Sequence, residues 1–247
     1  MSKRSPIEVL FMSPDSNDTG TRPGRDSQAQ RENTRRKILA TALAEFAAQG
    51  YFAASTRDIA RRAGMAAGLM YRYFPTKEEL LRELIDRSVA AWKDERQRRI
   101  GERPFADLRE FLATELVFQR DFLLDDRSDT GRFFLRHLFQ DQLPGRGKLI
   151  ACLLPGETLA AQIAAAQERG ELKPKVTAEA VRSLAEMVCA KFLHSFYFPD
   201  PDWPVADAAA LRPRIENCLQ AVFANVLKAP AVKKPPVSRE TLQGNLF

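Results

Sequence analysis

Cationic side chains of this 247-residue chain are concentrated between residues 34 and 80, where eight Lys or Arg accompany four Asp or Glu. Residues 101–228 carry sixteen Lys or Arg and eighteen Asp or Glu, so the excess of positive charge is local. Thr56 and Arg57 lie where we expect the first turn of a helix, and they offer a hydroxyl, free backbone N–H groups and a cation. Because such groups bind phosphate, this segment favours a nucleic acid as the partner.

Residue types that support catalysis or metal binding are sparse. The chain has two histidines, His137 and His194, and no spaced cluster of metal ligands or of a nucleophile with a base. Its three cysteines, Cys152, Cys189 and Cys218, form no Cys-x-x-Cys pair and are interpreted as small core residues. We therefore expect no catalytic residues, no metal site and no cofactor, and we expect that the chain is not an enzyme.

Three helices are expected to position the basic segment. An apolar stripe at helical spacing predicts an amphipathic helix over residues 34–49, which ends at the following glycine. Ser55, with Asp58 three residues later, predicts a capped second helix, and Gly64 ends it. A tight connection then leads into a third helix over residues 67–74. This order predicts a helix-turn-helix unit.

A series of residues within this segment stands at characteristic spacing: Gly50, Tyr51, Phe52, Ser55, Thr56, Ile59, Ala60, Ala63, Gly64, Gly68, Tyr71, Tyr73, Phe74, Lys77 and Leu80. The series resembles the N-terminal helix-turn-helix domain of the TetR/AcrR family of bacterial transcriptional regulators. The resemblance implies that residues 55–74 form the DNA-reading unit, with the third helix in the major groove. It also implies a repressor that binds a palindromic double-stranded DNA operator as a homodimer and that a small-molecule effector releases.

The resemblance indicates which side chains contact the duplex. Tyr71 and Lys77 match positions that hold DNA phosphates, and Arg72 and Tyr73 match the exposed face of the recognition helix. The predicted DNA-binding residues are Ser55, Thr56, Arg57, Ala67, Gly68, Leu69, Tyr71, Arg72, Tyr73 and Lys77.

The start of the recognition helix departs from the family pattern. Ala66 stands where the family has a Ser or Thr cap, and the loss of such a cap costs about 0.5–2 kcal/mol of helix stability. Leu69 replaces a polar residue, and it contacts a thymine methyl group but forms no hydrogen bond with a base. The alternative is therefore a helical interaction module with impaired DNA readout.

The whole sequence predicts an all-α fold, because no strand pattern competes with the helical periodicity. A helix from about residue 80 to residue 100 is expected to link the helix-turn-helix domain to a larger helical domain for ligand binding and dimerisation. The predicted segments are a disordered N-terminal arm over residues 1–31, the DNA-binding domain over residues 32–92, the ligand-binding and dimerisation domain over residues 93–228, and a flexible C-terminal tail over residues 229–247.

Ten of the sixteen phenylalanines lie between residues 105 and 198, the region in which the resemblance places an effector pocket. The candidate pocket residues for an apolar or aromatic effector are Trp92, Phe118, Phe122, Phe134 and His137, although a structural role stays open for the histidine. The last two long helices carry apolar stripes wide enough to form a four-helix bundle with a second copy. The candidate dimer-interface residues are Leu184, Val188, Phe192, Ile215, Leu219 and Val222.

The distribution of apolar residues bears on the cellular compartment. No uninterrupted apolar run approaches the roughly 18 residues that span a bilayer. The short apolar run at residues 7–12 is interrupted by an acidic residue and does not resemble a secretory signal. We therefore expect a cytoplasmic protein without a membrane partner.

Overall fold

The computed structural model describes residues 23–101, 103–198, 200 and 203–229. In these residues all regular structure is helical, and the only β-type pairings are two isolated bridges, which confirms the predicted all-α fold. The helices are α2 (Pro23–Gln49), α3 (Thr56–Arg62), α4 (Ala67–Tyr71), α5 (Lys77–Arg99), α6 (Leu108–Leu123), α7 (Asp129–His137), α8 (Arg146–Leu153), α9 (Gly156–Glu168), α10 (Ala178–His194) and α11 (Ala208–Val222).

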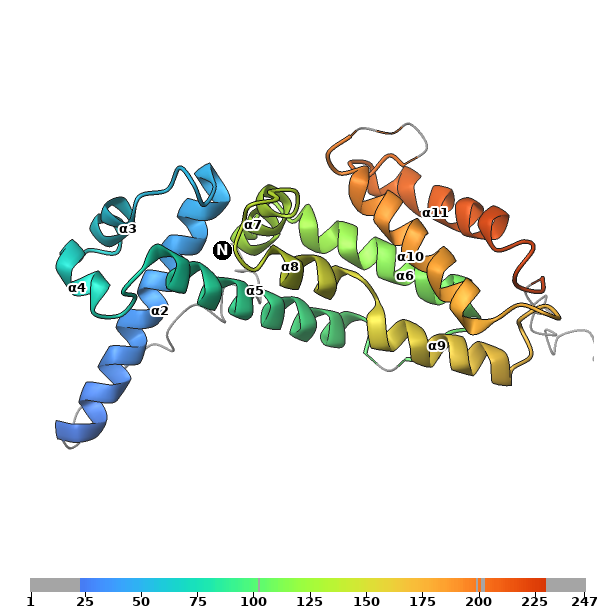
Figure 1. Ribbon diagram of the computed structural model, residues 1–247, viewed down its shortest axis with the longest axis horizontal. Coiled ribbons are helices and arrows are strands. Elements are labelled where there is room, and N and C mark those ends of the chain that lie inside the picture. The colour runs from blue at the N-terminus through green and yellow to red at the C-terminus, as the bar shows by residue number, and fades with distance from the viewer. Residues whose placement is uncertain (1–22, 102, 199, 201–202, 230–247) are drawn as a thin grey trace, which may run out of the picture.

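The N-terminal domain consists of α2, α3, α4 and the first part of α5, and it forms one end of the elongated molecule (Figure 1). Its core is the predicted apolar stripe of α2 packed on the inner faces of the other helices. Ile38, Phe46, Ile59, Met70 and Phe74 are all buried there. The N-terminal part of α2 extends beyond this core, away from the other helices (Figure 1).

The first helix begins earlier than the sequence indicated. Residues 1–31 were expected to form a disordered arm, but α2 starts at Pro23 and continues without interruption to Gln49. Proline is favoured at the first position of a helix because its missing N–H would have no partner there. The remainder of the predicted arm, residues 1–22, and almost all of the predicted C-terminal tail lie outside the described residues.

The third helix of the predicted helix-turn-helix unit is shorter than its expected span of residues 67–74. α4 ends at Tyr71, and the next two residues form turns in which Arg72 N–H donates to Leu69 O (3.1 Å) and Tyr73 N–H donates to Met70 O (2.9 Å). Phe74 precedes Pro75, and a residue before proline is disfavoured in the helical conformation. The helix therefore tightens and stops before the proline.

α5 links the two domains, as predicted. It starts behind Thr76, whose hydroxyl caps Glu79 N–H (3.1 Å), and it stops before Gly101, whose φ of +56° favours glycine. The next helix, α6, starts at Leu108. Asp107 provides its cap by accepting from Glu110 N–H (2.9 Å).

α6 lies at the centre of the C-terminal domain, where Phe111, Leu112 and Leu116 are fully buried. It contacts α7, α9, α10 and α11. Gly131 of α7 sits directly against α6, since a Cβ atom there would lie 2.5 Å from the carbonyl oxygen of Phe122. The close approach of α7 to α6 thus requires glycine at this position.

One segment of the described chain, residues 146–168, is long and apolar enough to cross a membrane by length and composition alone. It contains no uninterrupted apolar run of that length, because Lys148 and Glu157 interrupt it. In the structure this segment is two helices, α8 and α9, which meet at Pro155 and pack against α5, α6 and α10.

Candidate nucleic-acid interface

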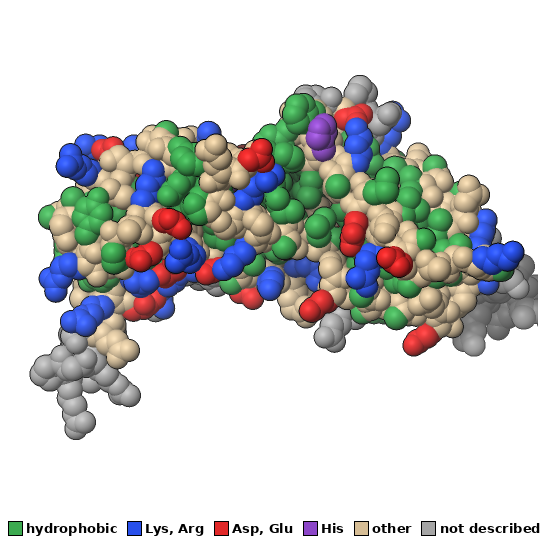
Figure 2. Space-filling model, in the orientation of Figure 1, with side chains coloured by type: hydrophobic (Ala, Val, Ile, Leu, Met, Phe, Trp, Pro, Cys, Tyr) green, Lys and Arg blue, Asp and Glu red, His purple; other side chains and the backbone are tan. Residues whose placement is uncertain are grey.

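The predicted DNA-binding residues of the helix-turn-helix unit lie at its surface. All ten predicted DNA-binding residues are exposed or half-buried, whereas Ile59, Ala60, Met70 and Phe74 between them are buried in the core. The fold therefore separates the residues of α3, α4 and their flanks into a core set and a solvent set. Lys and Arg side chains rim this end of the molecule (Figure 2).

A contact between two side chains ties the start of α3 to the end of α4. The hydroxyls of Thr56 and Tyr71 lie 2.9 Å apart, and Tyr71 keeps 44% of its surface exposed. Ser55 caps α3 by accepting from Arg57 N–H (3.2 Å), which confirms the predicted cap residue. The carboxylate of Asp58, three residues after this cap, forms an ion pair with Arg61 (2.7 Å).

The arginines of this surface divide into paired and unpaired side chains. Arg61 pairs with Asp58, and Arg62 pairs with Glu45, a carboxylate buried under α3. Arg57 and Arg72 are exposed and have no ion-pair partner among the described residues. The two unpaired guanidinium groups are therefore available to an anionic partner without the cost of breaking an existing pair.

The start of α4 is open toward solvent. Its N-cap residue, Ala66, makes no side-chain cap, and Leu69 is 39% exposed. A Cβ atom built on Gly68 would meet nothing within 4 Å, so no neighbour within the described chain requires glycine there. The α4 backbone is therefore open to solvent at this position.

Lys77 holds the loop between α2 and α3. Its ammonium group donates to the carbonyl oxygen of Phe52 (3.4 Å) and lies 4.5 Å from the centre of the Tyr51 ring. Burial lowers the pKa of Lys77, and burial together with the charge of Glu78 raises the pKa of Tyr51. The side chain is half-buried, so it supports the loop and keeps part of its charge toward solvent.

Tyr73 is fixed through its backbone. Its carbonyl oxygen accepts from Arg35 of α2 (3.1 Å), and the same guanidinium pairs with Glu83 and lies 4.4 Å from the centre of the Phe74 ring. Arg35 therefore orients the turn that follows α4. The sequence does not indicate this role, because the partners of Arg35 lie 38 and 48 residues away along the chain.

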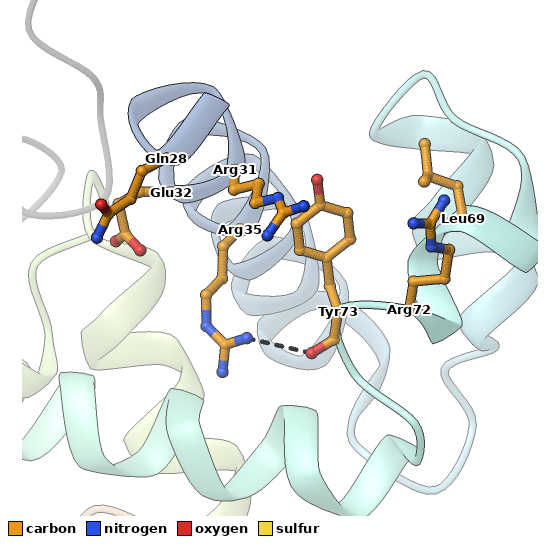
Figure 3. A pocket seen from close by; sticks show the side chains of 7 residues that line it. All are labelled: Gln28, Arg31, Glu32, Arg35, Leu69, Arg72 and Tyr73. Carbon is orange, nitrogen blue, oxygen red and sulfur yellow. Dashed lines mark hydrogen bonds between the residues drawn. The ribbon is translucent and has the colours of Figure 1, made fainter. Parts of the chain in front are cut away.

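An open groove of about 550 Å³ separates the N-terminal part of α2 from α4 (Figure 3). Its lining residues come from both helices and the turn after α4. They are Gln28, Arg31, Glu32, Arg35, Leu69, Arg72 and Tyr73. The α2 wall was absent from the predicted interface because those residues straddle the end of the expected disordered arm. Pro23, a residue type favoured at the first position of a helix, was the only local signal for this part of α2.

The candidate effector-pocket residues come together, but as a packed cluster. The Trp92 ring centre lies 4.7 Å from those of Phe118 and Phe122, and Phe122 lies 5.7 Å from Phe134. Each of these side chains is at most 4% exposed. Aromatic rings at these spacings stabilise one another, so the cluster occupies the space between α5, α6 and α7 as core.

His137 has a structural role at the domain junction. Its Nε2 accepts from Tyr51 N–H (2.9 Å), so the ring proton resides on Nδ1, which donates to Phe133 O (2.7 Å). Burial lowers the pKa of His137 to about 4, the Phe133 carbonyl opposes that shift, and the charge of Arg136 adds to it. Arg136 donates to Ala47 O (2.8 Å), so consecutive residues of α7 hold the C-terminal end of α2 and the loop after it.

A cleft of about 510 Å³ lies beside Trp92, between α5, α6 and the α8–α9 junction. Its polar lining includes Lys93 and an Arg96–Glu115 ion pair, and Leu153 and Leu154 contribute apolar surface. Burial raises the pKa of Glu115, and the Arg96 guanidinium opposes that shift. Among the predicted pocket residues, only Trp92 lines this cleft.

The candidate dimer residues lie mainly inside the subunit. Val188, Phe192, Ile215 and Leu219 are buried, and only Leu184 and Val222 are half-buried. The predicted dimer residues belong to the apolar stripes that pack on α6 and α9 within the subunit. Inward and outward apolar residues have the same helical period, so the sequence pattern alone does not distinguish them. The outward face of α10 instead carries Met187, which is 67% exposed.

Comparison with known proteins identifies the N-terminal domain. Residues 38–84 match the family model described as bacterial regulatory proteins, tetR family. The HTH-type transcriptional repressor KstR of Mycobacterium tuberculosis (strain ATCC 25618 / H37Rv) is 38% identical over 104 residues, which cover 40% of this chain and 46% of that protein. The chain thus spans less than half the length of this relative.

Solved structures extend the likeness to the whole fold. A TetR transcriptional regulator from Chloroflexus aurantiacus J-10-FL superposes with a TM-score of 0.60 at 20% identity, over 81% of this chain and 99% of that one. The transcriptional regulator FadR from Bacillus subtilis, solved in complex with stearoyl-CoA, superposes with a TM-score of 0.57 at 22% identity, over 74% of this chain and 96% of that one. At these identities the likeness concerns the fold alone.

Proposed function

This chain belongs to the TetR family of bacterial regulatory proteins through its N-terminal domain, and we propose that it is a cytoplasmic transcriptional repressor that binds a palindromic operator through α3 and α4. One observation carries the proposal: the helix-turn-helix residues divide into a buried core set and an exposed set with unpaired arginines. Two exposed arginines without carboxylate partners favour an anionic partner for this surface.

In the proposed complex α4 lies in the major groove. Arg72 reads guanine or another acceptor edge, and Leu69 contacts a thymine methyl group. Tyr71 and Lys77 hold phosphates on either side, and the Thr56 contact fixes the Tyr71 hydroxyl in place. The open space at Gly68 lets the α4 backbone approach the floor of the groove.

The proposed homodimer places two α4 helices at half-sites about one helical turn of DNA apart. The proposed homodimer is supported by exposed apolar side chains on the outward face of α10 and in the segment that follows this helix. Met187 is 67% exposed and Phe198 is 58% exposed. Hydrophobic side chains gather over α10 and α11 on the face seen in Figure 2. Large exposed apolar side chains of this kind are typical of a protein–protein interface.

The proposed effector is a small molecule with an apolar or aromatic body that enters the cleft beside Trp92. The cleft adjoins α5, and α7 packs along α2. A ligand that binds more tightly to one orientation of these helices would change the spacing of the two recognition helices. The ligand then releases the protein from the operator because the ligand has different affinities for the two conformers.

A selection from randomised duplexes at two salt concentrations tests this function and separates it from the alternative of an interaction module. We expect enrichment of one two-fold symmetric sequence and an affinity that falls steeply as salt rises. Absence of enrichment at both salt concentrations would reject sequence-specific regulation and favour the interaction module.

A further inference from the structure

The groove between α2 and α4 contains a local excess of positive charge. Four of its lining side chains are ionic: Arg31, Glu32, Arg35 and Arg72. Glu32 is already paired with Arg36 (3.2 Å) and Arg87 (3.4 Å), and Arg35 is paired with Glu83. Arg31 and Arg72, one from each wall, are exposed and have no ion-pair partner among the described residues.

The other lining groups suit the same kind of ligand. Gln28 and Tyr73 can donate hydrogen bonds from an amide and a hydroxyl, and Leu69 provides an apolar edge beside Arg72 (Figure 3). The carbonyl of Tyr73 is fixed by Arg35, so that wall of the groove is held in place. A planar guanidinium binds phosphate oxygens in pairs, so the unpaired Arg31 on the α2 wall can hold a phosphate while Arg72 on the facing wall stays directed at the bases that α4 reads.

We propose that this groove binds a backbone phosphate of the DNA strand that flanks the half-site read by α4. The proposal rests on the proposed function, because Leu69 and Arg72 belong both to the groove and to the recognition surface. Its new element is Arg31. The extended N-terminal part of α2 acts as a second wall that clasps the strand lying beside the recognition helix.

The site belongs to the duplex rather than to a free anion because it is open along the α4 surface. A single phosphate linkage held by Arg31 leaves its neighbouring sugars beside Leu69 and Tyr73. The contact is independent of base sequence, so it sets affinity and register rather than specificity.

The experiment combines the Arg31→Ala substitution with neutral methylphosphonate linkages, each of which replaces one backbone phosphate in or around the selected half-site. The effect of each linkage on affinity is compared between wild type and Arg31→Ala. Alanine favours the helical state at this exposed position, so the variant is expected to fold. We expect a slope of log affinity against log salt that is less steep by about 0.9 in Arg31→Ala. At one linkage in each half-site, neutralisation should weaken wild-type binding and leave Arg31→Ala unaffected.

Arg169→Ala is the control, because it removes the same charge at the C-terminal end of α9 and should keep the wild-type slope. Equal slopes for the two variants, or no linkage that couples to Arg31, would overturn the groove assignment while duplex binding itself persists. Wild-type protein without any duplex binding would instead overturn the proposed function. Inorganic phosphate that binds through Arg31 in NMR titrations, with no coupled linkage in the duplex, would assign the groove to a free anion and reject the DNA contact.

Discussion

Individual side chains of the helix-turn-helix unit have two kinds of task. Arg62, Arg35 and His137 each satisfy a specific internal partner, and their replacement would disturb the fold. Arg57 and Arg72 have no such partner within the described chain and are free for a ligand. The sequence alone does not show which arginines have an internal partner. The partner of Arg62 lies 17 positions away on another helix, and charge does not reveal which side chains pair.

Lys77 combines both tasks, so its replacement should affect both folding and DNA binding. For Lys77→Ala we expect weaker binding to operator and non-operator duplexes alike, and a salt slope less steep by about 0.9. Loss of the contact with the Tyr51 ring should also cost about 0.5–1 kcal/mol of unfolding free energy. Titrations by fluorescence anisotropy at several salt concentrations measure the first effect, with Lys77→Arg as the control. A slope unchanged from wild type would remove Lys77 from the phosphate contacts.

His137 should make the stability of the protein depend on pH. Its pKa in the folded state is about 4, mainly because of burial, whereas an unfolded histidine titrates near 6.5. The unfolded state therefore binds more protons between these values. The stabilisation is fully present above pH 6.5, and up to about 3 kcal/mol is lost as pH falls toward 4.

Urea unfolding of wild type and His137→Gln between pH 7 and pH 4 measures this effect. Carboxylates contribute to both curves, so the difference between them isolates the histidine. We expect the stability of the variant to fall less over this range. Parallel curves would show that His137 is protonated equally easily in both states.

At the scale of elements, the cap at Ser55 and the breaks at Gly50 and Gly64 were the most predictable features. Ser55, Thr76 and Thr177 each accept from a backbone N–H within their own first turn, as local chemistry requires. Gly50 and Gly101 adopt positive φ at helix ends. The start of α2 and the end of α4 were less predictable, because weak periodicity hid the first and Pro75, four residues beyond the helix, shortened the second.

The geometry of α4 predicts opposite effects of one substitution. Gly68→Ala should stabilise the folded protein by up to about 1 kcal/mol, because alanine favours the helix and its methyl group meets no neighbour. The same methyl group should weaken operator binding by about 1–3 kcal/mol if the duplex packs closely against α4. Thermal unfolding and operator titration test the two parts separately. An affinity equal to that of wild type would place the duplex away from Gly68.

At the scale of the molecule, the buried residues show how each domain packs, but they do not show which surface joins two subunits. The apolar stripes of α10 and α11 were assigned to a dimer interface, yet they are needed to cover α6 within one subunit. The composition of a helix shows that it buries a face, but not whether the partner is the same chain or a second copy. Outward residues become recognisable only once the fold is known.

Met187 provides the test of assembly. Met187→Glu should weaken the proposed homodimer by about 100-fold or more, because an unpaired carboxylate in an apolar interface costs several kcal/mol. Analytical ultracentrifugation over a range of concentrations measures the change, with Ala161→Glu on the exposed face of α9 as the control. A dimer as stable as wild type would place the interface elsewhere on the subunit.

Binding of the full chain to the selected duplex and to a scrambled duplex of equal length, each at two salt concentrations, tests sequence-specific recognition most directly. The proposed role of α3 and α4 predicts an affinity for the selected sequence at least about 1,000-fold higher, and a steep loss of affinity with salt on both duplexes. Equal affinities for the two duplexes would contradict it.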